Sequence, residues 1–123
     1  MEKTLLSRLE WFLRIGVFLT FLGHGVFAFS GNTYWLPYLT IFGFSEDIAL
    51  QLMSIIGVVD ILVAISILLK PYKIVVLYAL LWAFTTALMR LISGESIWSF
   101  IERGANWIVP LCLYLVLSYK TRN

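Results

Sequence analysis

Six polar side chains interrupt a strongly apolar chain of 123 residues. Two are arginines and two are acids, so the set could bind an anion, donate hydrogen bonds to a carbonyl group or carry a proton. A histidine and an asparagine add further hydrogen-bonding groups. Together they predict a polar binding pocket, although their spacing assigns no catalytic role to any of them. The six are His24, Asp60, Arg90, Glu102, Arg103 and Asn106.

The composition indicates which elements position these residues. Hydrophobic residues make up 61% of the chain and charged residues 13%, whereas a typical soluble domain is about 25% charged. A soluble fold of this composition would expose large apolar patches, which soluble monomers rarely do. We therefore expect lipid to be the solvent. The net charge of +2 is too small to indicate a nucleic-acid partner.

Four apolar segments approach or exceed the roughly 20 residues that a transmembrane helix needs. The first two are separated by an aromatic loop, 30–47, in which Pro37 and two glycines break the helical pattern. Its tyrosines and tryptophan favour the membrane surface. The sequence thus predicts a single domain, an all-α integral membrane four-helix transmembrane bundle. The helices are expected at about 9–29, 48–69, 74–92 and 100–119.

The first apolar run, 11–29, also has the layout of a secretory signal peptide, because a short basic stretch precedes it. However, the apolar part is long, and no small-x-small cleavage site follows Phe29. We favour a retained helix. Cleavage would remove one of the four spans.

Lysine and arginine residues are unevenly distributed between the two ends of these helices. With four spans, the N-terminus, the turn 70–73 and the C-terminus share one side. By the positive-inside rule both termini are predicted to be cytoplasmic, as in a multi-pass protein of a bacterial cytoplasmic (inner) membrane. The opposite side has only Arg90 and Arg103. The shared side has Lys3, Arg8, Arg14, Lys70, Lys73, Lys120 and Arg122.

Small residues mark the faces on which these helices should pack, because lipid does not drive helices together by hydrophobicity. Three alanines at spacings of four, within 79–87, form such a stripe, and Arg90 continues it. Asp60 lies on the small-residue face of the second helix. At 1.5 Å per residue, Arg90 lies roughly 24 Å and His24 roughly 20 Å from the cytoplasmic ends of their helices. All six except Asp60 should therefore converge in the outer half of the membrane.

Arg90 has a structural and a functional interpretation. A charge at bilayer depth is costly unless it is paired, so we first expect an ion pair with Glu102 that ties the third helix to the fourth. Glu95 is the other candidate acid. In the functional interpretation, Arg90 and Arg103 line a site for an anion or a quinone carbonyl group.

His24 and Asp60 also each have a structural and a functional interpretation. Two glycines flank His24 and leave room beside the imidazole for a ligand, although a histidine packed in the core is the commoner case. Asp60 is expected to be a neutral acid, hydrogen-bonded to Ser54, Thr20 or a backbone carbonyl group. The alternative is a carboxyl group that relays protons.

No motif in the chain indicates a metal site. Cys112 is the only cysteine, which excludes an intramolecular disulfide and a cysteine-based zinc or iron–sulfur site within one chain. The chain also has no glycine-rich phosphate loop and no HExxH motif.

Short motifs in the chain resemble those of DoxX-like four-helix membrane proteins. Residues 14–16 (RIG) and 23–25 (GHG) resemble the opening of that family, as do the length, the four spans and the aromatic loop. Residues 88–95 and 102–107 are similar to an uncharacterised branch and depart from the founding members. The resemblance implies a link to the membrane subunits of thiosulfate–quinone oxidoreductase or to assembly factors. It supplies no active-site residue.

The leading functional prediction is a quinone-linked redox accessory subunit. In it, Arg90 or His24 donates a hydrogen bond to a quinone carbonyl group, and Asp60 passes protons. The first alternative is a non-enzymatic assembly or structural partner of a larger membrane complex. The second is a small-solute transporter that acts as an oligomer, because four helices leave little room for a substrate path. The expected partners are the lipid bilayer and either another membrane protein or further copies of this chain. The sequence does not decide whether the protein is an enzyme.

Overall fold

The computed structural model describes residues 2–122, and this part of the chain is all-helical, without strands. Four helical stretches are long and apolar enough to cross a membrane, which confirms the predicted helical class and the four candidate spans. By composition the chain is a multi-pass membrane protein. The spans are α1 (Glu2–Phe29), α3 (Glu46–Leu69), α4 (Lys73–Ile92) and a stretch that joins α5 (Ile97–Ile101) to α6 (Gly104–Arg122).

The elements begin and end somewhat differently from the ranges expected of the sequence. α1 starts before the apolar run, since the polar residues ahead of it are good helix formers. The expected loop 30–47 contains a 3-10 turn, η1 (Thr33–Trp35), and a short helix, α2 (Leu36–Thr40), with Pro37 in its first turn. The fourth span is interrupted between Ile101 and Gly104.

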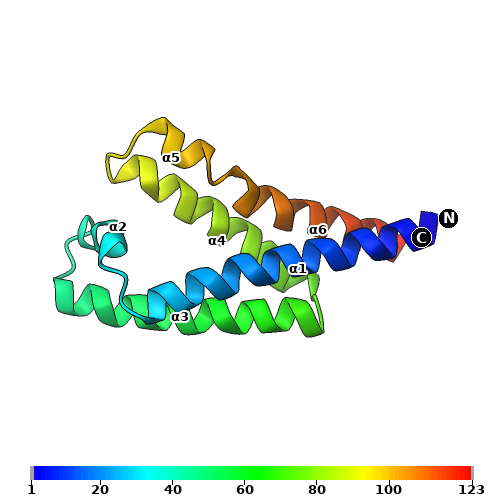
Figure 1. Ribbon diagram of the computed structural model, residues 1–123, viewed down its shortest axis with the longest axis horizontal. Coiled ribbons are helices and arrows are strands. Elements are labelled where there is room, and N and C mark those ends of the chain that lie inside the picture. The colour runs from blue at the N-terminus through cyan, green and yellow to red at the C-terminus, as the bar shows by residue number, and fades with distance from the viewer. Residues whose placement is uncertain (1, 123) are drawn as a thin grey trace.

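The helices form two pairs that converge at one end and diverge at the other. α1 packs mainly against α3, and α4 packs mainly against α6. Both chain termini lie at the convergent end, which we call the terminal end, whereas α2 and α5 lie at the divergent end (Figure 1). The divergent end therefore has space between the pairs for a site.

The α1–α3 contact depends on two glycines. A Cβ atom on Gly25 would lie 2.9 Å from the carbonyl oxygen of Gly57, and one on Gly57 would lie 2.6 Å from the amide nitrogen of Phe29. Side chains at these positions would separate the two backbones. Such close approach gains van der Waals contact where lipid supplies no hydrophobic force between helices.

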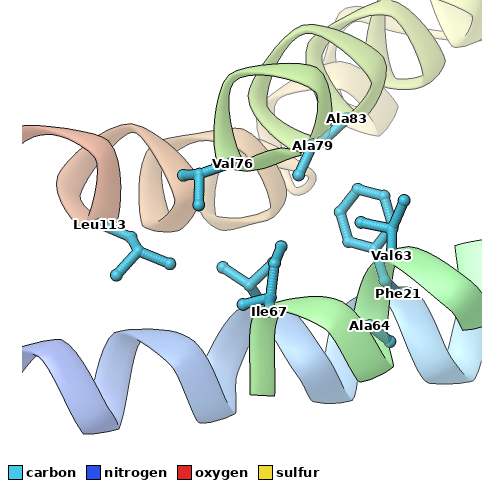
Figure 2. Packing of buried hydrophobic residues seen from close by; sticks show 9 residues of the cluster. Phe21, Val63, Ala64, Ile67, Val76, Ala79, Ala83 and Leu113 are labelled. Atoms are coloured by element: carbon cyan, nitrogen blue, oxygen red, sulfur yellow. The ribbon is translucent and has the colours of Figure 1, made fainter. Parts of the chain in front are cut away.

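A cluster of buried apolar side chains fills the middle of the molecule, and Figure 2 shows it between α4 above and α1 and α3 below. The alanine stripe of α4 is buried as predicted: Ala79, Ala83 and Ala87 are at most 5% exposed. Small side chains on α4 thus let larger ones from α1 and α3 reach across. The cluster consists of Val17, Phe21, Val63, Ala64, Ile67, Val76, Ala79, Ala83 and Leu113.

A buried cation joins three helices at the terminal end. Arg14 Nε donates to the carbonyl oxygen of Ile67 at 2.9 Å, and its Nη2 donates to that of Leu68, so it satisfies carbonyl groups left free at the end of α3. Its Nη1 lies 3.1 Å from Glu10, which also accepts a hydrogen bond of 2.7 Å from Lys120 on α6.

The glycine contact generates the first prediction. Gly25→Ala should lower the free energy of unfolding by roughly 1–3 kcal/mol, the usual cost of overpacking, because its methyl group meets the α3 backbone. Gly23→Ala is the matched control on the same helix, since a Cβ atom there meets no other atom within 4 Å. Thermal unfolding in mild detergent measures both variants. Equal melting temperatures would contradict the proposed packing.

Candidate functional site

A cavity of about 240 Å³ lies between the helix pairs, on the α2–α5 side of the apolar cluster. Its wall is mostly apolar and includes Trp35 and Trp82, with a few polar groups directed into it. This mixture is typical of small-molecule sites, whose volumes run from about 300 to 1,000 Å³. The smaller volume found here suits a single ring or a compact head group.

The structure brings five of the six predicted residues to this cavity. They come from α1, α3, α4 and the start of the fourth span's second helix, segments that are far apart in the sequence. Glu102 is the exception: its side chain is 66% exposed and lines a separate surface groove. The five that line the cavity are His24, Asp60, Arg90, Arg103 and Asn106.

The predicted ion pair between Arg90 and Glu102 is wrong, because Arg90 pairs with Glu95 instead, at 3.7 Å. The reason is the turn after α4. Gly94 has a φ of +91°, a left-handed conformation that favours glycine. The chain there turns back, so the Glu95 amide donates to the carbonyl oxygen of Arg90 at 3.0 Å and brings the two side chains together.

Tyr38 connects this ion pair to α2. Its hydroxyl group donates a hydrogen bond to the Glu95 carboxylate, and the Arg90 guanidinium lies 5.1 Å from the centre of its ring. Burial, followed by the hydrogen bond to Glu95, raises the pKa of Tyr38 to about 12. The three residues hold α2 across the divergent end of the cavity.

Arg103 and His24 present polar groups that the chain leaves unbonded. Arg103 Nε is buried and has no hydrogen-bond partner among residues 2–122, and the nearest Glu102 oxygen is 3.8 Å away. The His24 imidazole packs edge-on against Trp35, with 5.6 Å between ring centres. No hydrogen bond joins the imidazole to any residue that the structure describes. Both groups are therefore free to donate to a ligand.

The glycines beside His24 differ in their surroundings. The space beside Gly25 is taken by the α3 backbone, so the expected room for a ligand is absent there. Beside Gly23 the space is open, and this residue lines the surface groove. Only one of the two glycines therefore leaves room near the imidazole.

Asp60 is buried at the cavity wall, and the expected hydrogen bonds to Ser54, Thr20 or the backbone are wrong. Its Oδ1 has no hydrogen-bond partner within the described part of the chain. The Ser54 hydroxyl donates instead to the carbonyl oxygen of Leu50, one turn earlier on its own helix, at 3.2 Å. Trp82 across the cavity interacts with the carboxyl group. An acid held in an apolar wall with an unbonded oxygen is an expensive feature, and such features concentrate at functional sites.

Sequence reasoning missed the aromatic residues that complete the cavity. Trp35 and Tyr38 lie in a segment without helical periodicity, and Trp82 lies within an apolar run. The spacing of Trp82 from Arg90, eight residues or about two helical turns, was a usable signal that the two share a face. Glu10, four residues before Arg14, was the corresponding signal for the ion pair at the terminal end.

Metal chemistry gains no support from the described residues, among which no three His, Cys, Asp or Glu side chains lie close enough together to hold an ion. Comparison of the chain with protein-family models, with curated proteins and with solved structures finds no match.

The buried carboxyl group generates the second prediction. An unsatisfied buried polar group costs roughly 1–3 kcal/mol, so Asp60→Leu should unfold at the same temperature as the wild type or a few degrees higher. Asp47→Leu, at an exposed position in the first turn of the same helix, is the control and should be neutral or slightly destabilising. A clear loss of stability in Asp60→Leu would instead assign Asp60 a structural hydrogen bond.

Tyr38 generates the third prediction. Its pKa in the folded protein is above the ordinary value of about 10, so the unfolded chain loses this proton first. The resulting stabilisation is complete below about pH 10 and is lost as the pH rises toward the folded value of about 12. The melting temperature of the wild type should therefore fall more steeply above about pH 9 than that of Tyr38→Phe.

The control for this comparison is Tyr34→Phe, which removes a tyrosine that is 86% exposed in the same segment. Its pH dependence should follow the wild type. If all three proteins lose stability in parallel, the Tyr38–Glu95 interaction contributes nothing to folding.

Proposed function

We propose that the protein binds the ring head group of a quinone in this cavity and acts as a quinone-linked accessory subunit of a redox complex. One observation carries the proposal. A single apolar cavity combines unbonded donors, on His24 and Arg103, with the buried carboxyl group of Asp60, whose Oδ1 is unbonded. A quinone ring has an apolar face and two carbonyl oxygens, and this combination matches both.

The roles of the residues follow from their positions. Arg103 and His24 donate hydrogen bonds to one carbonyl oxygen, and Arg90 adds positive charge while Glu95 and Tyr38 hold it in place. Asp60 holds a proton at a carboxyl oxygen that the chain leaves unbonded. Trp35 and Trp82 pack against the ring faces. A bound quinone supplies two-electron, two-proton chemistry, and a partner subunit supplies the electrons.

The proposed topology places both termini in the cytoplasm and the cavity in the outer half of a bacterial cytoplasmic membrane. The lysine and arginine distribution supports it, because seven of the nine positive residues lie on the side of the termini. The structure also supports it, since both termini occur at one end (Figure 1). The resemblance to DoxX-like proteins is consistent with this location and stays a prediction.

The transporter and assembly-partner alternatives require different features of the chain. Phe21, Ile67 and Leu113 fill the space between the helix pairs (Figure 2), so an oligomeric transporter would need its path between chains and would not use this cavity as a passage. A passive assembly partner needs no cavity and gives no reason for an unsatisfied acid in its wall. The geometry therefore favours a binding role.

The fourth prediction tests quinone binding directly. Protein purified in mild detergent should yield a quinone on extraction and mass spectrometry. A short-chain benzoquinone should also quench its tryptophan fluorescence, because Trp35 and Trp82 line the cavity. Arg103→Gln should weaken binding about tenfold or more, since a hydrogen bond to a charged group contributes about 1.5–3 kcal/mol. His24→Phe should weaken it about fivefold, since a neutral hydrogen bond contributes about 1 kcal/mol.

Arg8→Gln, which removes an exposed arginine far from the cavity, is the control and should bind normally. Purified protein that carries only phospholipid and does not bind added benzoquinone would contradict the proposal. Co-purification with a larger membrane complex would then support the assembly-partner alternative.

A further inference from the structure

A surface groove lies beside the cavity, between α1 and the fourth span. Four residues line both spaces and form the boundary between them. The groove has a volume of about 440 Å³ and also includes Leu19, Gly23, Phe27 and Glu102. The shared residues are Thr20, His24, Arg103 and Asn106.

The groove exists because α1 and α6 separate along their length. Near the core the helices touch, and a Cβ atom on Gly16 would lie 3.3 Å from Val109 Cγ1. Seven residues later, roughly 10 Å farther along α1, a Cβ atom on Gly23 would meet no other atom within 4 Å. Figure 1 shows the same divergence of α1 and α6 from the terminal end toward α5.

The groove faces the lipid side of the molecule. Leu19 and Phe27, one turn to either side of Gly23, are 59% and 58% exposed. Exposed apolar side chains of this size on a candidate span are typical of a lipid-facing surface. The Glu102–Arg103 pair lies at the rim of the groove.

The divergent end of the cavity is covered in a different way. Tyr38, Leu39 and Phe42 lie over it, and the hydrogen bond from Tyr38 to Glu95 holds this cover to the turn after α4. On the side of the groove, by contrast, the cavity is bounded by the four shared residues.

From these observations we infer that the groove at Gly23 is a lateral portal, and that the ligand is a quinone with a long apolar tail that leaves the cavity through it. The inference rests on the proposed quinone binding. A cavity of about 240 Å³ accommodates a ring but not a long tail as well. The tail leaves the cavity beside His24 and passes Gly23, which has no side chain to block it. It then lies against Leu19, where it meets lipid chains.

The inference assigns Gly23 a function that helix packing does not require. Gly25, two residues away, is needed for the α1–α3 contact, whereas a Cβ atom on Gly23 would meet no atom of another helix within 4 Å. A glycine in a helix costs about 1 kcal/mol relative to alanine. At Gly23 the absence of a side chain leaves the portal open, and the helix bears this cost in stability.

The test compares two benzoquinones with the same substituted ring, one carrying a decyl tail and one without a tail. Wild-type protein in detergent should bind the tailed compound at least about tenfold more tightly. Gly23→Phe should remove most of this difference and leave the affinity for the tailless ring within about threefold of wild type. The readout is equilibrium quenching of tryptophan fluorescence, which a phenylalanine substitution does not disturb.

Val26→Phe is the matched control, because it adds an aromatic ring to an exposed position three residues farther along α1, outside the groove. It should bind both compounds as the wild type does. Gly23→Leu gives a smaller obstruction if Gly23→Phe does not fold, and should produce the same selective loss.

The outcomes separate the inference from the proposed function. If the wild type binds both rings equally, or if the Gly23 variants bind the tailed compound as well as Val26→Phe does, the portal is wrong and quinone binding stands. If the wild type binds neither compound, the proposed function itself fails and the portal fails with it.

Discussion

The rest of the structure depends on the way Arg14 is satisfied at the terminal end. A buried guanidinium is tolerated only if hydrogen bonds and charge partners replace water, and Arg14 finds them on α3 and on its own helix. It bonds the last carbonyl groups of α3 and pairs with Glu10, which Lys120 of α6 also contacts. These bonds hold α1, α3 and α6 together at one end. The helices can then diverge at the other end, and the cavity occupies the space between them.

Much of this arrangement could be predicted from the sequence because it follows from periodicity. Helical spacing put the alanine stripe and Arg90 on one face of α4, and Gly57 with Asp60 on one face of α3. Faces that carry small and polar residues turn inward in lipid, so His24, Arg90, Arg103 and Asn106 were expected to converge. Asp60 was expected to lie apart from them, and Glu102 to join them. To predict that residues on these faces meet, it is enough to know that the four helices pack together, and no single contact has to be known.

The partners of these residues could not be predicted, because they depend on turns and on local geometry. Arg90 pairs with Glu95 because Gly94 adopts a left-handed conformation. A sequence indicates that glycine permits this conformation but not that it is used. The cover of the cavity comes from η1 and α2, which are too short to show a hydrophobic periodicity in the sequence. Ser54, one of the partners expected for Asp60, donates to its own helix instead, an option open to any serine in a helix.

The link between Glu10 and Lys120 spans 110 residues of the chain and has a consequence for biogenesis. Arg14 already has Glu10 and the α3 carbonyl groups as partners before α6 is made. The α1–α3 half can therefore assemble as a charge-balanced hairpin while the ribosome is still synthesising the rest. Lys120, at the far end of α6, joins this group after the other partners. Arg103 and Asn106 also line the cavity, so its wall is complete only once the fourth span is in place.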